Sequence, residues 1–102
     1  MDISLASRPR KLKRISTPGL KGMAYQQQLD ICRALERENP RFVDYVLKPT
    51  TDEMWNLIDG KRTIADIIDC TLLEFNLDTQ ADTWLVVFAG WLNAGLIAVG
   101  SD

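Results

Sequence analysis

The apolar residues between Lys48 and Ile68 form two helical patterns, separated by the pair Asp59-Gly60. A Thr-x-x-acid pattern, which is typical of a helix start, precedes each of them, at Thr50 and at Thr63. Glycine favours the left-handed residue that closes a helix. The segment therefore predicts a short helix, a tight turn and a second helix, which together form a helix-turn-helix unit. The apolar faces of these helices contain Met54, Trp55, Leu57 and Ile58 in the first, and Ile64, Ile67, Ile68, Thr71 or Leu72, and Phe75 in the second.

A further apolar stripe covers residues 79–95 and predicts a third core helix. The pair Thr79 and Asp82 repeats the helix-start pattern, and Gly95 marks the helix end. Residues 96–99 then predict a short extended tail that docks on the core. The stripe consists of Ala81, Trp84, Leu85, Phe88, Trp91 and Leu92.

Upstream of these helices, residues 23–38 predict an additional helix and residues 41–48 predict a strand. In the first segment Asn39-Pro40 ends the helical pattern, although a strand over Met23–Leu29 is an alternative interpretation. In the second segment, RFVDYVLK, β-forming residues alternate, and the mixed second face suits the edge of a sheet. The apolar residues at helical spacing in the first segment are Tyr25, Leu29, Cys32 and Leu35.

Residues 1–22 show neither a helical nor a strand period and are rich in Ser, Pro, Gly, Lys and Arg. They hold six basic residues and one acid, a net charge of +5, whereas residues 23–102 hold six basic residues and thirteen acids, a net charge of −7. Two interpretations stay open, a solvated basic arm or a short edge strand at Leu12–Ile15. In either case we expect residues 23–102 to form the functional domain and to keep their fold when residues 1–14 are deleted.

The length of 102 residues suits one domain with one modest core. No apolar run approaches the length of a membrane span, and the basic N-terminus lacks the apolar stretch of a secretory signal. We therefore expect a cytoplasmic protein that does not enter the membrane. Cys32 and Cys70 both lie in apolar helical patterns, which predicts two buried free thiols, with a disulfide as the alternative.

The chain lacks the residues that most catalytic sites use. There is no histidine, no Cys-x-x-Cys pair and no glycine-rich phosphate loop. The carboxylates are those expected at helix ends and on the surface, and no pair of them is marked as a catalytic dyad. These observations predict a protein that is not an enzyme and has no catalytic residue, metal site or cofactor. A binding module or adaptor is the remaining class.

The order of pieces after Pro40 resembles that of PqqD-like proteins, the recognition elements of ribosomally made, modified peptides. In that family a strand leads into a short helix that ends in Asp-Gly, then come basic residues, a Thr, an apolar helix and a third helix that ends near Gly-Leu-Ile. Here the matching pieces are Asp59-Gly60, Lys61-Arg62-Thr63, Ile64–Phe75 and Gly95-Leu96-Ile97, and the match covers residues 41–99. The helix at residues 23–38 departs from the family, whose members place strands there.

The resemblance implies an α+β fold of the winged helix-turn-helix type, with a small antiparallel sheet packed on three helices and the extra N-terminal helix added. It also implies an adaptor that captures the leader segment of a precursor peptide and presents it to a modifying enzyme, often one of the radical S-adenosylmethionine type. An extended peptide would add to the edge of the 42–48 strand and contact one flank of the third helix. We expect that flank to leave its tryptophan pair partly exposed, although a purely structural role in the core has equal weight. The candidate peptide-binding residues are Phe42, Val43, Asp44, Tyr45, Val46, Leu47, Thr83, Trp84, Val87 and Trp91.

Two other functions stay open. A winged helix-turn-helix can bind DNA, but residues 79–95 contain no Lys or Arg, which disfavours a nucleic-acid partner. A structural subunit of an enzyme complex is the second alternative. An exposed strand edge would also allow a homodimer.

Overall fold

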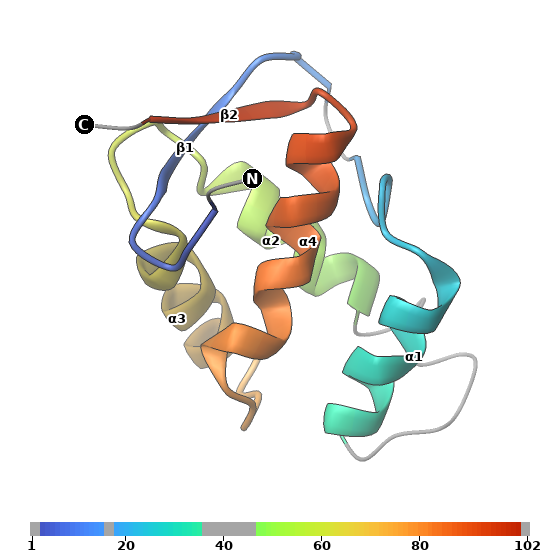
Figure 1. Ribbon diagram of the computed structural model, residues 1–102. Coiled ribbons are helices and arrows are strands. Elements are labelled where there is room, and N and C mark those ends of the chain that lie inside the picture. Colours follow the sequence, from blue (N-terminus) through green and yellow to red (C-terminus); the bar gives the residue numbers. More distant parts are fainter. Residues whose placement is uncertain (1–2, 16–17, 36–46, 101–102) are drawn as a thin grey trace.

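The protein is a small α+β domain, and the computed structural model describes residues 3–15, 18–35 and 47–100. Within these residues, two strands from opposite ends of the chain form an antiparallel sheet at one end of the molecule (Figure 1), and four helices lie beneath it. No helix among the described residues is long and apolar enough to span a bilayer. The elements are β1 (Arg8–Lys11), α1 (Tyr25–Ala34), α2 (Lys48–Asn56), α3 (Ile64–Glu74), α4 (Ala81–Asn93) and β2 (Ile97–Gly100).

The sheet pairs β1 with the tail that follows α4, so Arg8 lies opposite Gly100 and Lys11 lies opposite Ile97. The extended tail is thereby confirmed as a strand. The strand in the N-terminal segment lies at Arg8–Lys11, so its prediction at Leu12–Ile15 is wrong. Pro9 does not prevent pairing, because its backbone nitrogen, which has no hydrogen to donate, faces away from β2. The Pro9 carbonyl faces the same way and accepts a hydrogen bond from the Gly60 amide at 3.1 Å.

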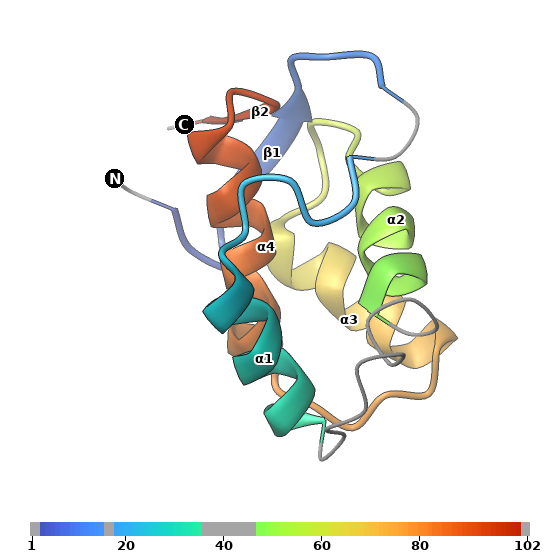
Figure 2. The same cartoon turned by 90° about the vertical axis from the view of Figure 1, so that its right-hand side faces the viewer.

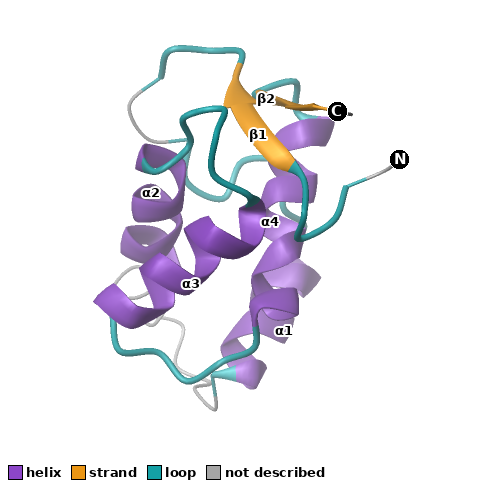
Figure 3. Ribbon diagram, turned by 90° about the vertical axis from the view of Figure 1, so that its left-hand side faces the viewer, coloured by secondary structure: helices purple, strands orange, loops and turns teal. Residues whose placement is uncertain are grey.

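The N-terminal segment is also tied to the start of α3. The Ser7 carbonyl accepts from the Ile64 amide and the Leu5 carbonyl accepts from the Ala65 amide, each at 2.9 Å. These amides belong to the first turn of a helix, where backbone donors lack intrahelical partners. Figure 3 shows β1 crossing above the start of α3. The interpretation of residues 3–15 as a loosely attached arm is therefore wrong.

The three tryptophans form the centre of the core, and each side chain is fully buried. The Trp55 and Trp91 rings meet edge to face with centroids 5.2 Å apart. Each buried indole N–H has an acceptor: Trp55 donates to the Ile15 carbonyl at 2.9 Å, Trp91 donates to the Gly19 carbonyl at 3.2 Å, and Trp84 donates to the Thr79 hydroxyl.

One of the three predicted helix starts is confirmed. The Thr63 hydroxyl accepts from the Asp66 amide at 3.1 Å, and the Asp66 carboxylate accepts from the Thr63 amide at 3.4 Å. The start predicted at Thr50 is wrong, because α2 already begins at Lys48. Proline is well suited to a first helical turn, and Pro49 occupies that turn.

The start predicted at Thr79 is also wrong, because its hydroxyl lies 2.7 Å from the Trp84 indole nitrogen and the N-cap position of α4 is Gln80. Lys48 opens a helix, so the predicted strand does not extend to residue 48. Its residues 41–46 lie outside the described part of the chain.

The additional N-terminal helix is confirmed as α1, which excludes a strand over Met23–Leu29. Its buried face contains Ile31 and Cys32, whereas Tyr25, which the helical pattern placed on the apolar face, is 72% exposed. Figure 2 shows α1 beside α4, and the two helices run antiparallel. Gly22, just before α1, approaches Gly90 of α4 so closely that a Cβ on Gly22 would collide with the Gly90 backbone, and a Cβ on Gly90 would lie 3.0 Å from the Gly22 backbone.

The turn between α2 and α3 follows the prediction. Gly60 has a φ of +79°, in the region that favours glycine. The Asp59 carboxylate accepts from the amides of Lys61 and Arg62, each at 2.8 Å, and from the Arg62 guanidinium at 3.2 Å. These backbone hydrogen bonds, from Arg62 first and Lys61 second, lower the pKa of Asp59.

Candidate peptide-binding site

A groove of about 290 Å³ lies between α1 and the first turns of α4. It is the feature of the described structure that best matches the predicted adaptor role, because it combines an apolar floor with polar rims. Helix α1 contributes Gln27, Asp30, Ile31 and Ala34, and α4 contributes Asp82, Thr83 and Val86.

The groove follows from the helical repeat of the two elements. On α1 the lining residues are three or four positions apart, so they share one face of the helix. On α4, Val86 lies one turn after Asp82 and Thr83. The close approach of Gly22 to Gly90 brings the start of α1 against the later part of α4. The groove lies beyond this contact, beside the first turns of α4, where larger side chains separate the two helices.

The charge of the groove is negative, because its lining holds two carboxylates and no basic residue. Asp30 accepts a hydrogen bond from Gln26 at 3.0 Å, and Arg33 lies 3.8 Å from the same carboxylate oxygen in an exposed ion pair. Asp82 lies in the first turn of α4 and makes no hydrogen bond or ion pair to any residue that the structure describes. Its charge therefore remains available to a ligand cation.

The predicted site residues are only partly brought together. Thr83 lines the groove. Trp84, Val87 and Trp91 are at most 1% exposed, so the expected exposed tryptophan pair is wrong and these residues belong to the core. Leu47 is also fully buried, just before α2. The remaining predicted residues, Phe42, Val43, Asp44, Tyr45 and Val46, lie outside the described part of the chain.

Asp82 and Val86 are the α4 residues of the groove that were not among the predicted site residues. The predicted apolar stripe did not include Val86, and Asp82 was expected only as part of a helix start. Gly90 was the available signal, because a glycine in the middle of an apolar helix often marks the close approach of another backbone. With α1 placed against Gly90, the residue one turn earlier, Val86, comes to face α1.

No reactive group was found in or near the groove among the described residues. Cys32, next to Ile31 on α1, is buried, and this burial raises the pKa of its thiol, so it stays protonated. Cys70 is exposed on α3, which corrects the prediction that both thiols are buried. No group of three or more metal-binding side chains occurs in residues 3–15, 18–35 and 47–100. The groove thus offers shape and charge to a ligand.

Comparisons of the chain with protein-family models, with curated proteins and with solved structures found no match.

Proposed function

We propose that the protein is a non-catalytic adaptor that binds a segment of a precursor peptide in the α1–α4 groove and presents it to a modifying enzyme. The groove is the observation that carries the proposal, and the resemblance of residues 41–99 to PqqD-like proteins supports it. In this proposal α2, α3 and α4 act as the helices of a winged helix-turn-helix and β1 with β2 acts as its small sheet, while α1 supplies a wall that the family pattern does not include.

The groove predicts the kind of peptide segment that would bind. Ile31, Ala34 and Val86 present an apolar floor, and Asp30 and Asp82 place a carboxylate on each helix. An apolar side chain flanked by Lys or Arg would match this arrangement. A volume of about 290 Å³ is at the low end of ligand pockets, which span roughly 300–1,000 Å³. It suits one or two anchoring side chains of an extended peptide.

The proposed groove replaces most of the predicted site but retains one of its α4 residues. Thr83 is common to both, and Val86 takes the role that was predicted for Val87. Addition of the peptide to a strand edge remains part of the proposal for residues 42–46, which lie outside the described part of the chain.

DNA binding has less support. Neither α3 nor α4, the helices that could enter a groove of DNA, contains Lys or Arg, and both carry acidic residues. Their charge would repel phosphate.

The experiment that tests the function is a titration in which fluorescence anisotropy measures the binding of short labelled peptides encoded beside the gene. We expect one of them to bind, and we expect Asp82→Asn to weaken binding about threefold to tenfold, because one charged contact is lost. Asp78→Asn is the matched control, since Asp78 is exposed and does not line the groove. Equal affinity of the two variants would place the peptide elsewhere on the molecule.

A further inference from the structure

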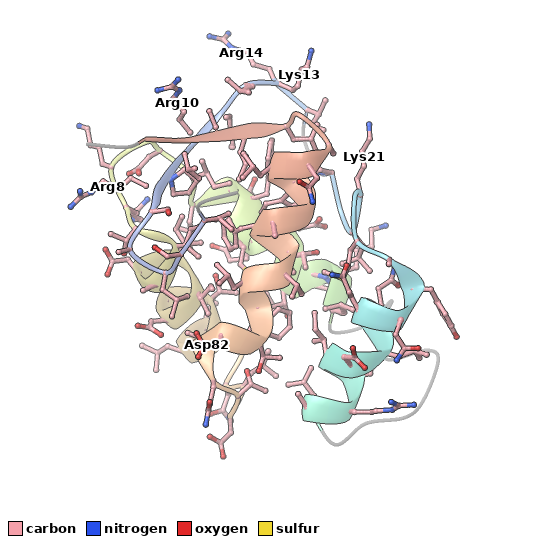
Figure 4. All side chains as sticks on the ribbon, viewed as in Figure 1. Arg8, Arg10, Lys13, Arg14, Lys21 and Asp82 are labelled. Atoms are coloured by element: carbon pink, nitrogen blue, oxygen red, sulfur yellow. The ribbon has the colours of Figure 1, made fainter. Side chains whose placement is uncertain are left out.

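A basic surface covers the end of the molecule that carries the sheet. It comprises Arg8 and Arg10 of β1, Lys13 and Arg14 of the loop that follows, and Lys61 of the α2–α3 turn, all exposed. The Nε of Arg8 donates to the Lys61 carbonyl at 3.1 Å, and a Cβ on Gly60 would lie 3.7 Å from the Arg10 Cβ, which joins the turn to the strand. Figure 4 shows Arg10, Lys13 and Arg14 projecting from this end, while Asp82 of the groove lies at the opposite end.

The charge of this basic surface is not neutralised within the described chain. Arg10, Lys13, Arg14 and Lys61 have no ion pair with residues 3–15, 18–35 or 47–100. The nearest carboxylate in sequence, Asp59, is already bound by its own turn through Lys61 and Arg62 amides. Concentrated, unpaired charge of one sign attracts a partner of the opposite sign.

The loop within this surface is held in place, so its cations are presented in a fixed arrangement. The Leu12 amide donates to the Leu96 carbonyl at 2.8 Å, and the Ile15 carbonyl accepts from the buried Trp55 indole at 2.9 Å. Just before this loop, at the end of β1, Lys11 Nζ lies 5.1 Å from the centroid of a Trp55 ring. A prearranged surface loses less conformational entropy when a partner binds.

Two aliphatic side chains among the cations indicate the class of partner. Leu12 is 52% exposed and Ile15 is 40% exposed. Phosphates of a nucleic acid make no use of aliphatic contacts. An amphipathic helix buries its apolar face roughly 5–10 Å into a bilayer, whereas about half of each of these two residues is already covered by the protein. A protein segment that lies flat on this surface, with carboxylates around apolar side chains, would contact both the cations and the exposed parts of Leu12 and Ile15.

We infer that the basic surface docks an acidic protein segment in which carboxylates alternate with apolar side chains. The surface lies at the other end of a molecule 39 Å long from the α1–α4 groove, so both can be occupied at once. This inference does not depend on the groove, and it holds for an adaptor of any kind that must engage a second protein.

The test uses the full chain and a labelled peptide of repeated Glu-Glu-Leu, with poly-glutamate of equal charge, oligothymidylate of equal charge and vesicles containing phosphatidylserine as the competing probes. We expect the Glu-Glu-Leu peptide to bind most tightly at physiological salt. The double variant Arg10→Glu, Arg14→Glu should weaken it by about tenfold or more, because two attractive contacts become repulsive. Lys21→Glu is the control and makes half of the charge change of the double variant. Lys21 is an exposed cation on the loop that leads into α1, separate from the basic surface.

Leu12→Ser tests the apolar part of the contact. This substitution should weaken binding of the Glu-Glu-Leu peptide but leave binding of poly-glutamate unchanged. Tighter binding of oligothymidylate or of vesicles would overturn the inference, as would equal binding of the two peptides. Because Lys21→Glu makes half of the charge change, a loss of binding free energy with it that is half that of the double variant or more would show that net charge alone is measured, and would overturn the inference. Circular dichroism of each variant excludes unfolding as the cause, and all the changed residues are exposed.

Discussion

Gly90 in α4 lies against the backbone of Gly22, so that a Cβ on Gly90 would be 3.0 Å from the Gly22 carbonyl carbon and 3.3 Å from the Met23 amide nitrogen. This contact brings α1 against α4, and the groove between these helices depends on it. In an open helix the exchange of Gly for Ala stabilises by roughly 0.5–1 kcal/mol. Here the added methyl group meets backbone that has little room to move.

We therefore expect Gly90→Ala to destabilise the protein by about 1–3 kcal/mol, as overpacking does in other cores. Thermal unfolding followed by circular dichroism measures the change. Gly19→Ala is a useful comparison, because a Cβ on Gly19 meets no atom within 4 Å and only its φ of +60° opposes the substitution. A higher melting temperature for Gly90→Ala would contradict the close approach of the two backbones.

Deletion of residues 1–14 is expected to unfold the domain, contrary to the prediction from sequence. The deletion removes β1, which pairs with β2, and it removes the carbonyls of Leu5, Ser7 and Pro9 that accept from the start of α3 and from Gly60. Buried or half-buried amides left without partners cost about 1–3 kcal/mol each, and a domain has only about 5–15 kcal/mol in total. A truncated protein with an unchanged circular dichroism spectrum and melting temperature would refute this prediction.

The difference between expectation and structure at the N-terminus has a physical cause. Local patterns reveal segments that bury one face, which is why α1, α2, α3 and α4 were all expected as helices. Residues 3–15 are held mainly by backbone hydrogen bonds to distant amides, and such bonds leave no periodic trace in the side chains. Thr79 shows the same limit, since its hydroxyl could serve either a helix start or an indole, and only the position of Trp84 decides between them.

The candidate site was predictable to a similar degree. The importance of α4 followed from its apolar stripe, and Thr83 was included. The choice between Val86 and Val87 required the position of α1, which depends on Gly22 and Gly90 meeting across a long separation in sequence.

The stability of the protein should depend on pH through Asp59. Hydrogen bonds from the amides of Arg62 and Lys61 lower the pKa of this carboxyl in the folded state, so its contribution is present above the unfolded pKa and is lost as the pH falls through the folded pKa. The pH range concerned lies below about 4, the ordinary range of aspartate. Burial raises the pKa of Asp52, with an opposing effect of Lys48, so the contribution of Asp52 has the opposite sign.

Comparison of variants isolates the contribution of Asp59. We expect Asp59→Asn to lower the melting temperature at neutral pH. The decrease in melting temperature should become smaller at about pH 3 and below, where the carboxyl becomes protonated in the unchanged protein. Asp69→Asn, on the exposed face of α3, is the control. A difference between Asp59→Asn and the unchanged protein that stays constant over this pH range would show that the turn does not depend on the ionised carboxylate.

The last prediction distinguishes a residue of the groove from its neighbour in the core. Val86 is half-buried and lines the groove, whereas Val87 is 1% exposed. Val87→Lys should prevent folding, because a buried unpaired ammonium is strongly unfavourable. Val86→Lys should fold, yet it removes part of the apolar floor and places a cation beside Asp82, where a basic peptide would bind. Peptide affinity should then fall by about tenfold or more, equivalent to about 1.4 kcal/mol.

Asn93→Lys adds the same charge to an exposed position of the same helix outside the groove and should leave the affinity unchanged. Because Val86→Lys and Asn93→Lys have the same net charge, a loss of affinity confined to Val86→Lys can only come from the groove itself. Undiminished affinity in a folded Val86→Lys protein would instead direct the search for the peptide site to the segment around residues 42–46.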